Sequence, residues 1–227
     1  QIEGAYNEDG KGLSIWDFYS HEKGKILHNE TGDVACDHYH HFREDILLMK
    51  EMGIKYYRLS LSWTRLIPNG TGKVNQVGVV FYNTLFDTLL ENGIQPMVTL
   101  FHWDYPNELH RKGGWLNPES PDWFEAYAKL CTELFSDRVK YWMTINEPQV
   151  FIGCGYDIGK FAPFLTLPKE ELVRITHNVL LSHGKAVRAI RENAIIKPVI
   201  GFAPTGPCYT PENNTDEAIE KARKASF

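Results

Sequence analysis

The sequence predicts an α/β fold in which β-strands separated by α-helices form a parallel sheet. Four short apolar segments, rich in β-branched and aromatic residues, have the composition of buried strands. Longer segments between them carry apolar residues at three- and four-residue spacing, which is typical of amphipathic helices. Strands that alternate with helices in this way form βα units, and the strands of such units run parallel.

The elements follow one another in a regular order. The predicted strands cover residues 55–61, 95–101, 140–145 and 198–203. The predicted helices cover residues 37–52, 78–92, 121–136 and 169–193, and a last helix begins at Thr215. Asp37 is expected to cap the first helix with its side chain, and Gly53 and Gly93 to end the first two helices in the left-handed conformation.

Two architectures fit this order, a doubly wound sheet and a (β/α)8 barrel. Neither GxGxxG nor GxxxxGK[ST] occurs in the sequence, so no phosphate-binding motif favours the doubly wound sheet. Polar and aromatic residues instead lie in or just after the carboxyl-terminal halves of three strands, at Arg58 and Trp63, at His102-Trp103-Asp104, and at Asn146-Glu147-Pro148. In a barrel these strand ends open onto the one face that carries the active site, so a (β/α)8 TIM barrel is the predicted fold.

Composition and charge exclude several function classes. With 24 Lys and Arg against 29 Asp and Glu, the net charge is −5 and no basic run is present, so we expect no nucleic acid partner. No stretch approaches the about 20 apolar residues of a membrane span, and the start of the chain carries no basic leader, which favours a cytoplasmic location.

The four cysteines form no CxxC pair and are expected to be reduced, mostly buried thiols. His38, His40 and His41 invite a metal site, but neither a metal nor a cofactor is expected.

Two motifs carry candidate chemistry. Glu147 follows an apolar strand, where partial desolvation raises a carboxyl pKa and suits the group to protonate a leaving group; a plain turn before Pro148 is the alternative. His102 offers a hydrogen-bond donor and Trp103 a flat apolar face for a pyranose ring; a loop with a buried aromatic residue is the alternative.

A series of motifs in order resembles glycoside hydrolase family 1, the β-glucosidase family, over about residues 1–205. The motifs are Gln1-Ile-Glu-Gly-Ala5, Ser14-Ile-Trp-Asp17, Gly32-Asp-Val-Ala-Cys-Asp-His-Tyr-His40, Tyr57-Arg-Leu-Ser-Leu-Ser-Trp63, Val98-Thr-Leu-Phe-His-Trp-Asp104, Gly113-Gly-Trp-Leu116 and Thr144-Ile-Asn-Glu-Pro148. The resemblance implies a retaining β-glycosidase on a (β/α)8 barrel, in which two carboxyl groups act as nucleophile and acid/base.

The resemblance also implies roles for particular residues. Glu147 matches the general acid/base, and Asn146 matches the residue that holds the sugar 2-hydroxyl. Gln1 and His102 match residues that bind hydroxyls on the far side of the glycone, and Trp103 matches a wall of that pocket.

Arg58 matches an arginine beside the nucleophile that helps to keep it ionised. The substrate is expected to be a small β-glucoside or oligosaccharide. On the leaving-group side, Gln149 and Phe161-Ala-Pro-Phe164 depart from the family pattern, so the aglycone is not predicted.

Part of the family pattern is missing. No glutamate lies in a Thr-Glu-Asn-Gly-type nucleophile motif, and only four of eight strands are visible, which the resemblance equates with strands 2 to 5. We therefore expect residues 1–227 to be the N-terminal part of a single barrel domain, lacking the first strand and strands 6–8 and inactive without a complementary C-terminal polypeptide. The alternatives are a non-catalytic sugar- or protein-binding relative and a truncated or engineered inactive scaffold.

Overall fold

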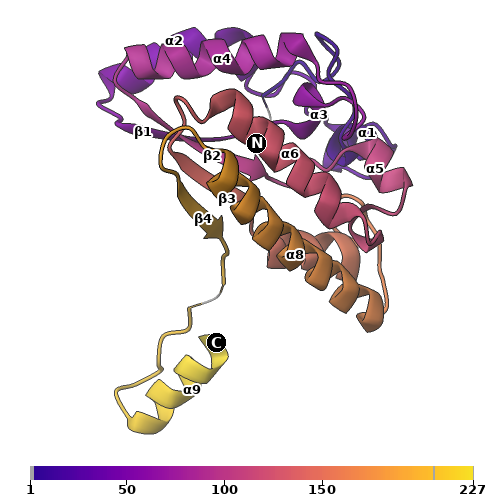
Figure 1. Ribbon diagram of the computed structural model, residues 1–227. Helices are drawn as coiled ribbons and strands as arrows, with labels where there is room; N and C mark the ends of the chain where they lie inside the picture. Colours follow the sequence, from indigo (N-terminus) through magenta and orange to yellow (C-terminus); the bar gives the residue numbers. More distant parts are fainter. Residues whose placement is uncertain (1–2, 207, 227) are drawn as a thin grey trace.

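The computed structural model describes residues 3–206 and 208–226 and contains a four-stranded parallel sheet (Figure 1). The strands lie in the order β1 (Tyr56–Ser60), β2 (Gln95–Phe101), β3 (Tyr141–Asn146) and β4 (Val199–Ala203). All three ladders are parallel, and each strand pairs with the next one along the chain. The four strands predicted from the sequence are thus confirmed.

The long helices also lie where the apolar spacing predicts them. They are α2 (His38–Glu51), α4 (Gln76–Glu91), α6 (Ser120–Phe135), α8 (Lys169–Asn193) and α9 (Asp216–Ser226). The remaining helical segments are too short to show an apolar period in the sequence. They are the short helices α1 (Ile15–Ser20), α3 (Trp63–Leu66), α5 (Asn107–Arg111) and α7 (Pro148–Ile152) and the turns η1 (Leu27–Asn29), η2 (Gly114–Leu116) and η3 (Gly153–Asp157). Among the described residues, no helix is both long and apolar enough to cross a membrane.

One face of the sheet packs against helices, and the other is open. Val98, Leu100 and Trp142 are buried, and the Tyr127 hydroxyl of α6 donates to the Leu100 carbonyl oxygen at 3.2 Å. On the opposite face Tyr56 is 54% exposed, although its ring contacts that of Tyr141. Figure 1 shows α4, α6 and α8 running side by side along the sheet. A doubly wound sheet reverses its strand order and carries helices on both faces, so this architecture is instead part of a (β/α) barrel.

A buried ion pair holds the N-terminal segment against the end of β1. Arg65 has no exposed surface, and its Nε donates to Glu3 Oε1 at 2.5 Å. The Tyr82 hydroxyl donates to the other Glu3 oxygen at 3.1 Å, and the guanidinium of Arg65 lies 4.0 Å from the Tyr39 ring centre. Since a buried charge is tolerated only when it is paired, this arrangement fixes where residues 3–5 run.

Two details differ from the sequence predictions. Gly53 and Gly93 have φ of +75° and +74° as predicted, but Asp37 is itself left-handed (φ +53°) and its side chain does not cap α2. It pairs instead with His40, at 2.6 Å from Nδ1 to Oδ1. No disulfide joins the four cysteines, all of which the structure describes; only Cys131 is buried, however, because Cys36 and Cys208 lie in exposed loops.

The contact between α3 and α4 leads to a stability prediction. A Cβ on Gly78 would lie 2.3 Å from the Arg65 carbonyl oxygen, which is backbone and does not yield easily. We expect Gly78→Ala to lower the free energy of unfolding by about 1–3 kcal/mol. Gly184 in α8 has open space around its Cβ position, so Gly184→Ala should raise the free energy of unfolding by about 0.5–1 kcal/mol. Urea unfolding of both variants tests this, and equal stability of the two would contradict it.

Candidate active site

The carboxyl ends of β1, β2 and β3 bring together side chains that are far apart in the sequence. Arg58 Nη2 donates to Asn146 Oδ1 at 2.5 Å, and Arg58 Nε donates to Thr99 Oγ1 at 3.1 Å. Asn146 Nδ2 lies 3.0 Å from His102 Nε2, and His102 Nδ1 lies 3.2 Å from Ser60 Oγ. We call Arg58, Ser60, Thr99, His102 and Asn146 the strand-end network.

The hydrogen bonds of this network determine its proton positions. Arg58 has only donors to offer, so the Asn146 atom that it contacts is the amide oxygen. Asn146 therefore turns its NH2 group toward His102, whose Nε2 must accept. The imidazole proton then sits on Nδ1 and is donated to Ser60 Oγ. His102 is consequently neutral, with one defined tautomer.

The electrostatic environment keeps His102 neutral. The pKa of His102 is lowered to about 4, mainly by burial and in part by the positive charge of Arg58. A proton on Nε2 would also place two donors against each other, because the Asn146 NH2 group already points there. His102 therefore donates through Nδ1, whose partner is Ser60, whereas Nε2 accepts.

Trp103 extends the network by its ring nitrogen. Its Nε1 donates to the Asn146 carbonyl oxygen at 3.0 Å, and the ring is half-buried. Phe161 lies 5.7 Å from Trp103 and 5.8 Å from Trp16 between ring centres, so the three rings form one aromatic surface. The residue that departs from the family motif at position 161 therefore adds an apolar ring beside the predicted sugar wall.

Glu147 follows directly on Asn146 and begins α7, with Pro148 at its first position. Its backbone N–H donates to the Ala203 carbonyl oxygen at 2.7 Å, which ties the end of β3 to the end of β4. Its side chain is half-buried. A carboxyl group placed here, beside an ordered amide and an indole, is able to give or take a proton from a bound molecule.

Two residues of this site have strained backbones. Trp103 has φ of +79° and Glu147 has φ of +44°, in the left-handed region that non-glycine residues rarely adopt. Each costs of order 1–3 kcal/mol and persists only where the surroundings hold it. Such residues cluster at functional sites, and both lie immediately after strands that carry the strand-end network.

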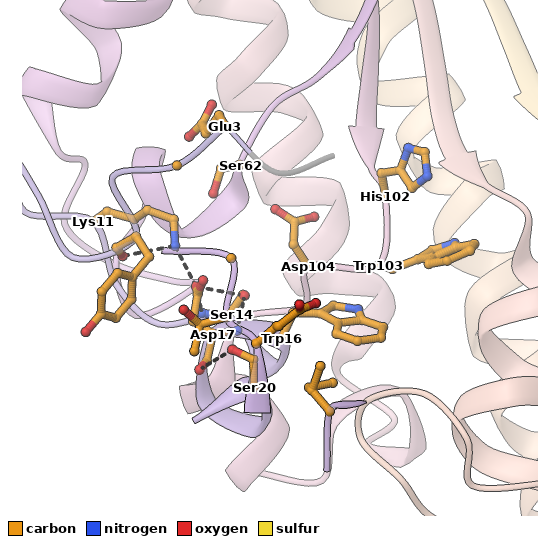
Figure 2. A pocket seen from close by; sticks show the side chains of 16 residues that line it. Glu3, Lys11, Ser14, Trp16, Asp17, Ser20, Ser62, His102, Trp103 and Asp104 are labelled. Atoms are coloured by element: carbon orange, nitrogen blue, oxygen red, sulfur yellow. Dashed lines mark hydrogen bonds and ion pairs between the residues drawn. The ribbon is translucent and has the colours of Figure 1, made fainter. Parts of the chain in front are cut away.

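A cavity of about 460 Å³ adjoins the strand-end network (Figure 2). His102, Trp103 and Asp104 contribute to its wall, together with Trp16 and the N-terminal segment. Figure 2 shows Lys11 and Asp17 across the cavity from His102; their ion pair is 2.6 Å long. The cavity falls within the about 300–1,000 Å³ that small-molecule sites occupy.

The structure therefore assembles most of the predicted site residues. Arg58, His102, Trp103, Asn146 and Glu147 meet at one edge of the sheet. The prediction for Gln1 falls outside the described residues. The sequence analysis named Asp104 as a strand-end residue without giving it a role, and it missed Ser60 and Thr99. Alternation in β1 places Ser60 on the same face as Arg58, and the register pairs Ser60 with Thr99, so strand periodicity was the available signal.

The histidine run lies away from the strand-end network and pairs with carboxylates. His38 Nδ1 is 2.6 Å from Asp45 Oδ2, and His40 lies between Asp37 and Glu8. The sequence analysis did not predict these pairings. Within residues 3–206 and 208–226, no three His, Cys, Asp or Glu side chains are grouped so that they could hold a metal ion.

Comparison with known proteins agrees with the resemblance seen in the sequence. The model of glycosyl hydrolase family 1 matches residues 1–227. β-Glucosidase A of Acetivibrio thermocellus is 50% identical over 222 residues, and a coniferin β-glucosidase of Pinus contorta is 45% identical over 244 residues. These alignments cover 98% and 100% of this chain but 49% and 48% of the relatives, so the chain spans about half the length of the relatives it matches.

The fold comparison gives the same result. A solved structure of a Thermotoga maritima β-glucosidase in complex with glucoimidazole superimposes with a TM-score of 0.92 and 45% identity, over 99% of this chain and 50% of that one. The same enzyme with deoxynojirimycin also has a TM-score of 0.92. Since the family model spans the whole sequence and the fold agrees, the chain belongs to glycosyl hydrolase family 1.

Proposed function

We propose that this chain is the acid/base part of a retaining β-glucosidase, with Glu147 as the general acid and base. Its residues 1–227 form the N-terminal part of one (β/α)8 barrel domain, and a complementary C-terminal polypeptide supplies the nucleophile glutamate. The observation that carries the proposal is the strand-end network, which orders Asn146, the residue directly before Glu147, against Arg58 and His102. No metal or cofactor takes part in the proposed reaction.

The proposed reaction uses the geometry in two steps. The nucleophile carboxylate attacks the anomeric carbon while Glu147 gives its proton to the departing oxygen. Glu147 then takes a proton from water as the covalent intermediate is hydrolysed. One N–H of the Asn146 amide is bonded to His102, so the other can donate to a sugar hydroxyl, and the Trp103 ring offers an apolar face. Arg58 orients Asn146 and, in the complete barrel, lies beside the nucleophile.

The relatives support a small sugar as the ligand. Their names are β-glucosidases and glucan glucohydrolases, and the solved Thermotoga maritima structures contain sugar-like inhibitors such as glucoimidazole. We extend this to the present chain as a β-glucoside or a short oligosaccharide.

Open apolar surfaces support the complementary polypeptide. Large apolar side chains are exposed at α2 and α8, with Met52, directly after α2, 76% exposed and Val173 on α8 69% exposed. Leu48 and Leu180 are also exposed on these helices. In the described part of the chain, β1 and β4 have no second strand beside them, and such strand edges can pair with further strands.

The role of Glu147 is tested by substitution. We mix the chain with the polypeptide that covers the remaining half of the Acetivibrio relative. In this complex, Glu147→Gln should lower kcat on an alkyl β-glucoside by about 10²–10⁴-fold, because that leaving group needs a proton. An aryl glucoside with an acidic phenol should be far less affected in its first step. Glu170→Gln, on the exposed start of α8, is the control and should leave both rates unchanged. An unchanged rate for Glu147→Gln on the alkyl glucoside would refute the role.

The need for a second polypeptide is tested without any variant. The 227-residue chain alone should not hydrolyse an aryl β-glucoside, because it lacks the nucleophile motif. Addition of the complementary half should create activity that saturates at one to one stoichiometry. Full activity of the chain alone would contradict the proposal, and a complex that forms but binds sugar without turnover would indicate the non-catalytic alternative.

The neutral His102 leads to a pH prediction. Its pKa is about 4 when folded, against about 6.5 when unfolded, so the unfolded chain binds more protons between these values. Its contribution to the free energy of unfolding is therefore fully present above pH 6.5 and is lost as the pH falls to 4, by up to about 3 kcal/mol. His102→Gln should show a smaller loss between pH 6.5 and 4 in urea unfolding. The same loss in parent and variant would show that other groups cause it.

A further inference from the structure

Arg58 orients the Asn146 amide, so the position of the Arg58 side chain decides how the strand-end network is arranged. Arg58 is exposed, and a long exposed side chain has many rotamers open to it. Besides the bond to Asn146, its Nε donates to Thr99 Oγ1 at 3.1 Å. Thr99 has no exposed surface, so it is the fixed end of this contact. The group that holds the Thr99 hydroxyl therefore influences the whole network.

The Thr99 hydroxyl lies between a group that can only donate and a group that can only accept. A guanidinium has no acceptor, so Thr99 Oγ1 accepts from Arg58. On its other side, Thr99 Oγ1 lies 3.9 Å from the Met143 sulfur, and a thioether has no proton to give. Thr99 therefore donates to Met143. The bond to sulfur is weak, but together the two partners leave the hydroxyl one orientation.

The other members of the network can each take either role. The Asn146 amide presents its oxygen or its NH2 group after a half-turn, and the His102 imidazole has two neutral tautomers. The Ser60 hydroxyl donates or accepts. None of these three groups fixes the direction of the hydrogen bonds alone. Arg58 and Met143 each have a single possible role, and Thr99 is the residue that joins them.

The register of the sheet places Thr99 between its partners. Thr99 pairs with Ser60 on β1 and with Met143 on β3, so it stands in the middle of a row across three strands. Strict alternation along β3 would put Asn146 on the face opposite to Met143. The register shifts between these two residues, and an irregularity of this kind re-aims a side chain. The Asn146 amide is thereby brought to Arg58.

We propose that Thr99, held by Met143, is a positioning residue that fixes Arg58. Arg58 then sets the Asn146 amide, and the amide sets the tautomer of His102. Without the Thr99 hydroxyl, Arg58 is released and the amide is able to turn its oxygen toward His102, which then carries its proton on Nε2. The inference rests on the proposed function only where catalysis is measured, because the tautomer is a property of this chain alone.

Four variants of the full 227-residue chain separate this role from general packing. Thr99→Val keeps nearly the same shape and removes the hydroxyl, whereas Thr99→Ser keeps the hydroxyl. Met143→Leu conserves volume and removes the sulfur acceptor. Thr132→Val is the matched control, because Thr132 is also fully buried but its hydroxyl donates to the Ala128 carbonyl oxygen within α6.

The first readout is the ¹⁵N NMR spectrum of the His102 ring at neutral pH, assigned by the loss of its signals in His102→Gln. The parent chain should show a protonated Nδ1 and an unprotonated Nε2. Thr99→Val should show both tautomers, because the Asn146 amide is no longer held. Met143→Leu should show the same change to a smaller extent, since the bond from Arg58 to Thr99 remains. Thr99→Ser and Thr132→Val should match the parent.

The second readout is hydrolysis of an alkyl β-glucoside by the complex with the complementary half. The proposed function assigns Asn146 to the sugar 2-hydroxyl, and hydrogen bonds to this hydroxyl strengthen in the transition state. We therefore expect Thr99→Val to lower kcat by about tenfold and to change KM less. Thr99→Ser should restore most of the loss, and Thr132→Val should leave both parameters unchanged.

Several results would overturn the proposal. They are an Nε2–H tautomer in the parent chain, a single Nδ1–H tautomer in Thr99→Val, and an equal change in Thr132→Val. An unchanged kcat in Thr99→Val would show that Thr99 has no effect on the reaction. If Thr99→Val does not fold, a parent-like His102 spectrum in Met143→Leu still contradicts the proposal. The tautomer is read without catalysis, so this result stands even if Glu147→Gln leaves hydrolysis unchanged and the proposed function fails.

Discussion

The organisation of the site depends on the hydrogen bond from Arg58 to Asn146. A guanidinium can only donate, so this one contact decides which way the Asn146 amide faces. The amide then decides that His102 accepts at Nε2 and carries its proton on Nδ1. Three side chains, on β1, on β3 and directly after β2, thus share a single defined pattern of donors and acceptors. Preorganisation of this kind lets a site present fixed dipoles to a ligand without rearranging first.

The parallel sheet makes that contact possible. Arg58 and Asn146 are 88 residues apart in the chain, yet the register of β1, β2 and β3 brings their side chains within 2.5 Å. The strands end at this edge with residues in the left-handed region, at Trp103 and Glu147, which turn the chain abruptly outward. The strain is held by contacts that belong to the sheet, such as the bond from the Glu147 N–H to Ala203. The regular strands and their irregular ends therefore act together to position the site residues.

The sequence predicted the strands, the long helices and most of the site, but not the way the site residues interact. Apolar periodicity depends only on local burial, so it revealed all four strands and the helices of eleven or more residues. The motif positions revealed Arg58, His102 and Asn146. The orientation of Asn146 and the tautomer of His102 depend on contacts between distant strands and loops. The predicted cap at Asp37 failed for the same reason, because His40 competes for its carboxylate.

The strand-end network also indicates which functional groups of a complete barrel this chain would supply. All of its members lie on β1, β2, β3 or the loop that follows β2, so under the proposed function the groups that contact the glycone are ordered within this chain. The exposed apolar side chains of α2 and α8 lie away from this network, and under the proposed function further helices pack against them. A carboxyl pair about 5–5.5 Å apart then has to form across the junction between the two parts. Under the proposed function, association therefore creates the catalytic pair, while the donors and acceptors around Glu147 are already in place.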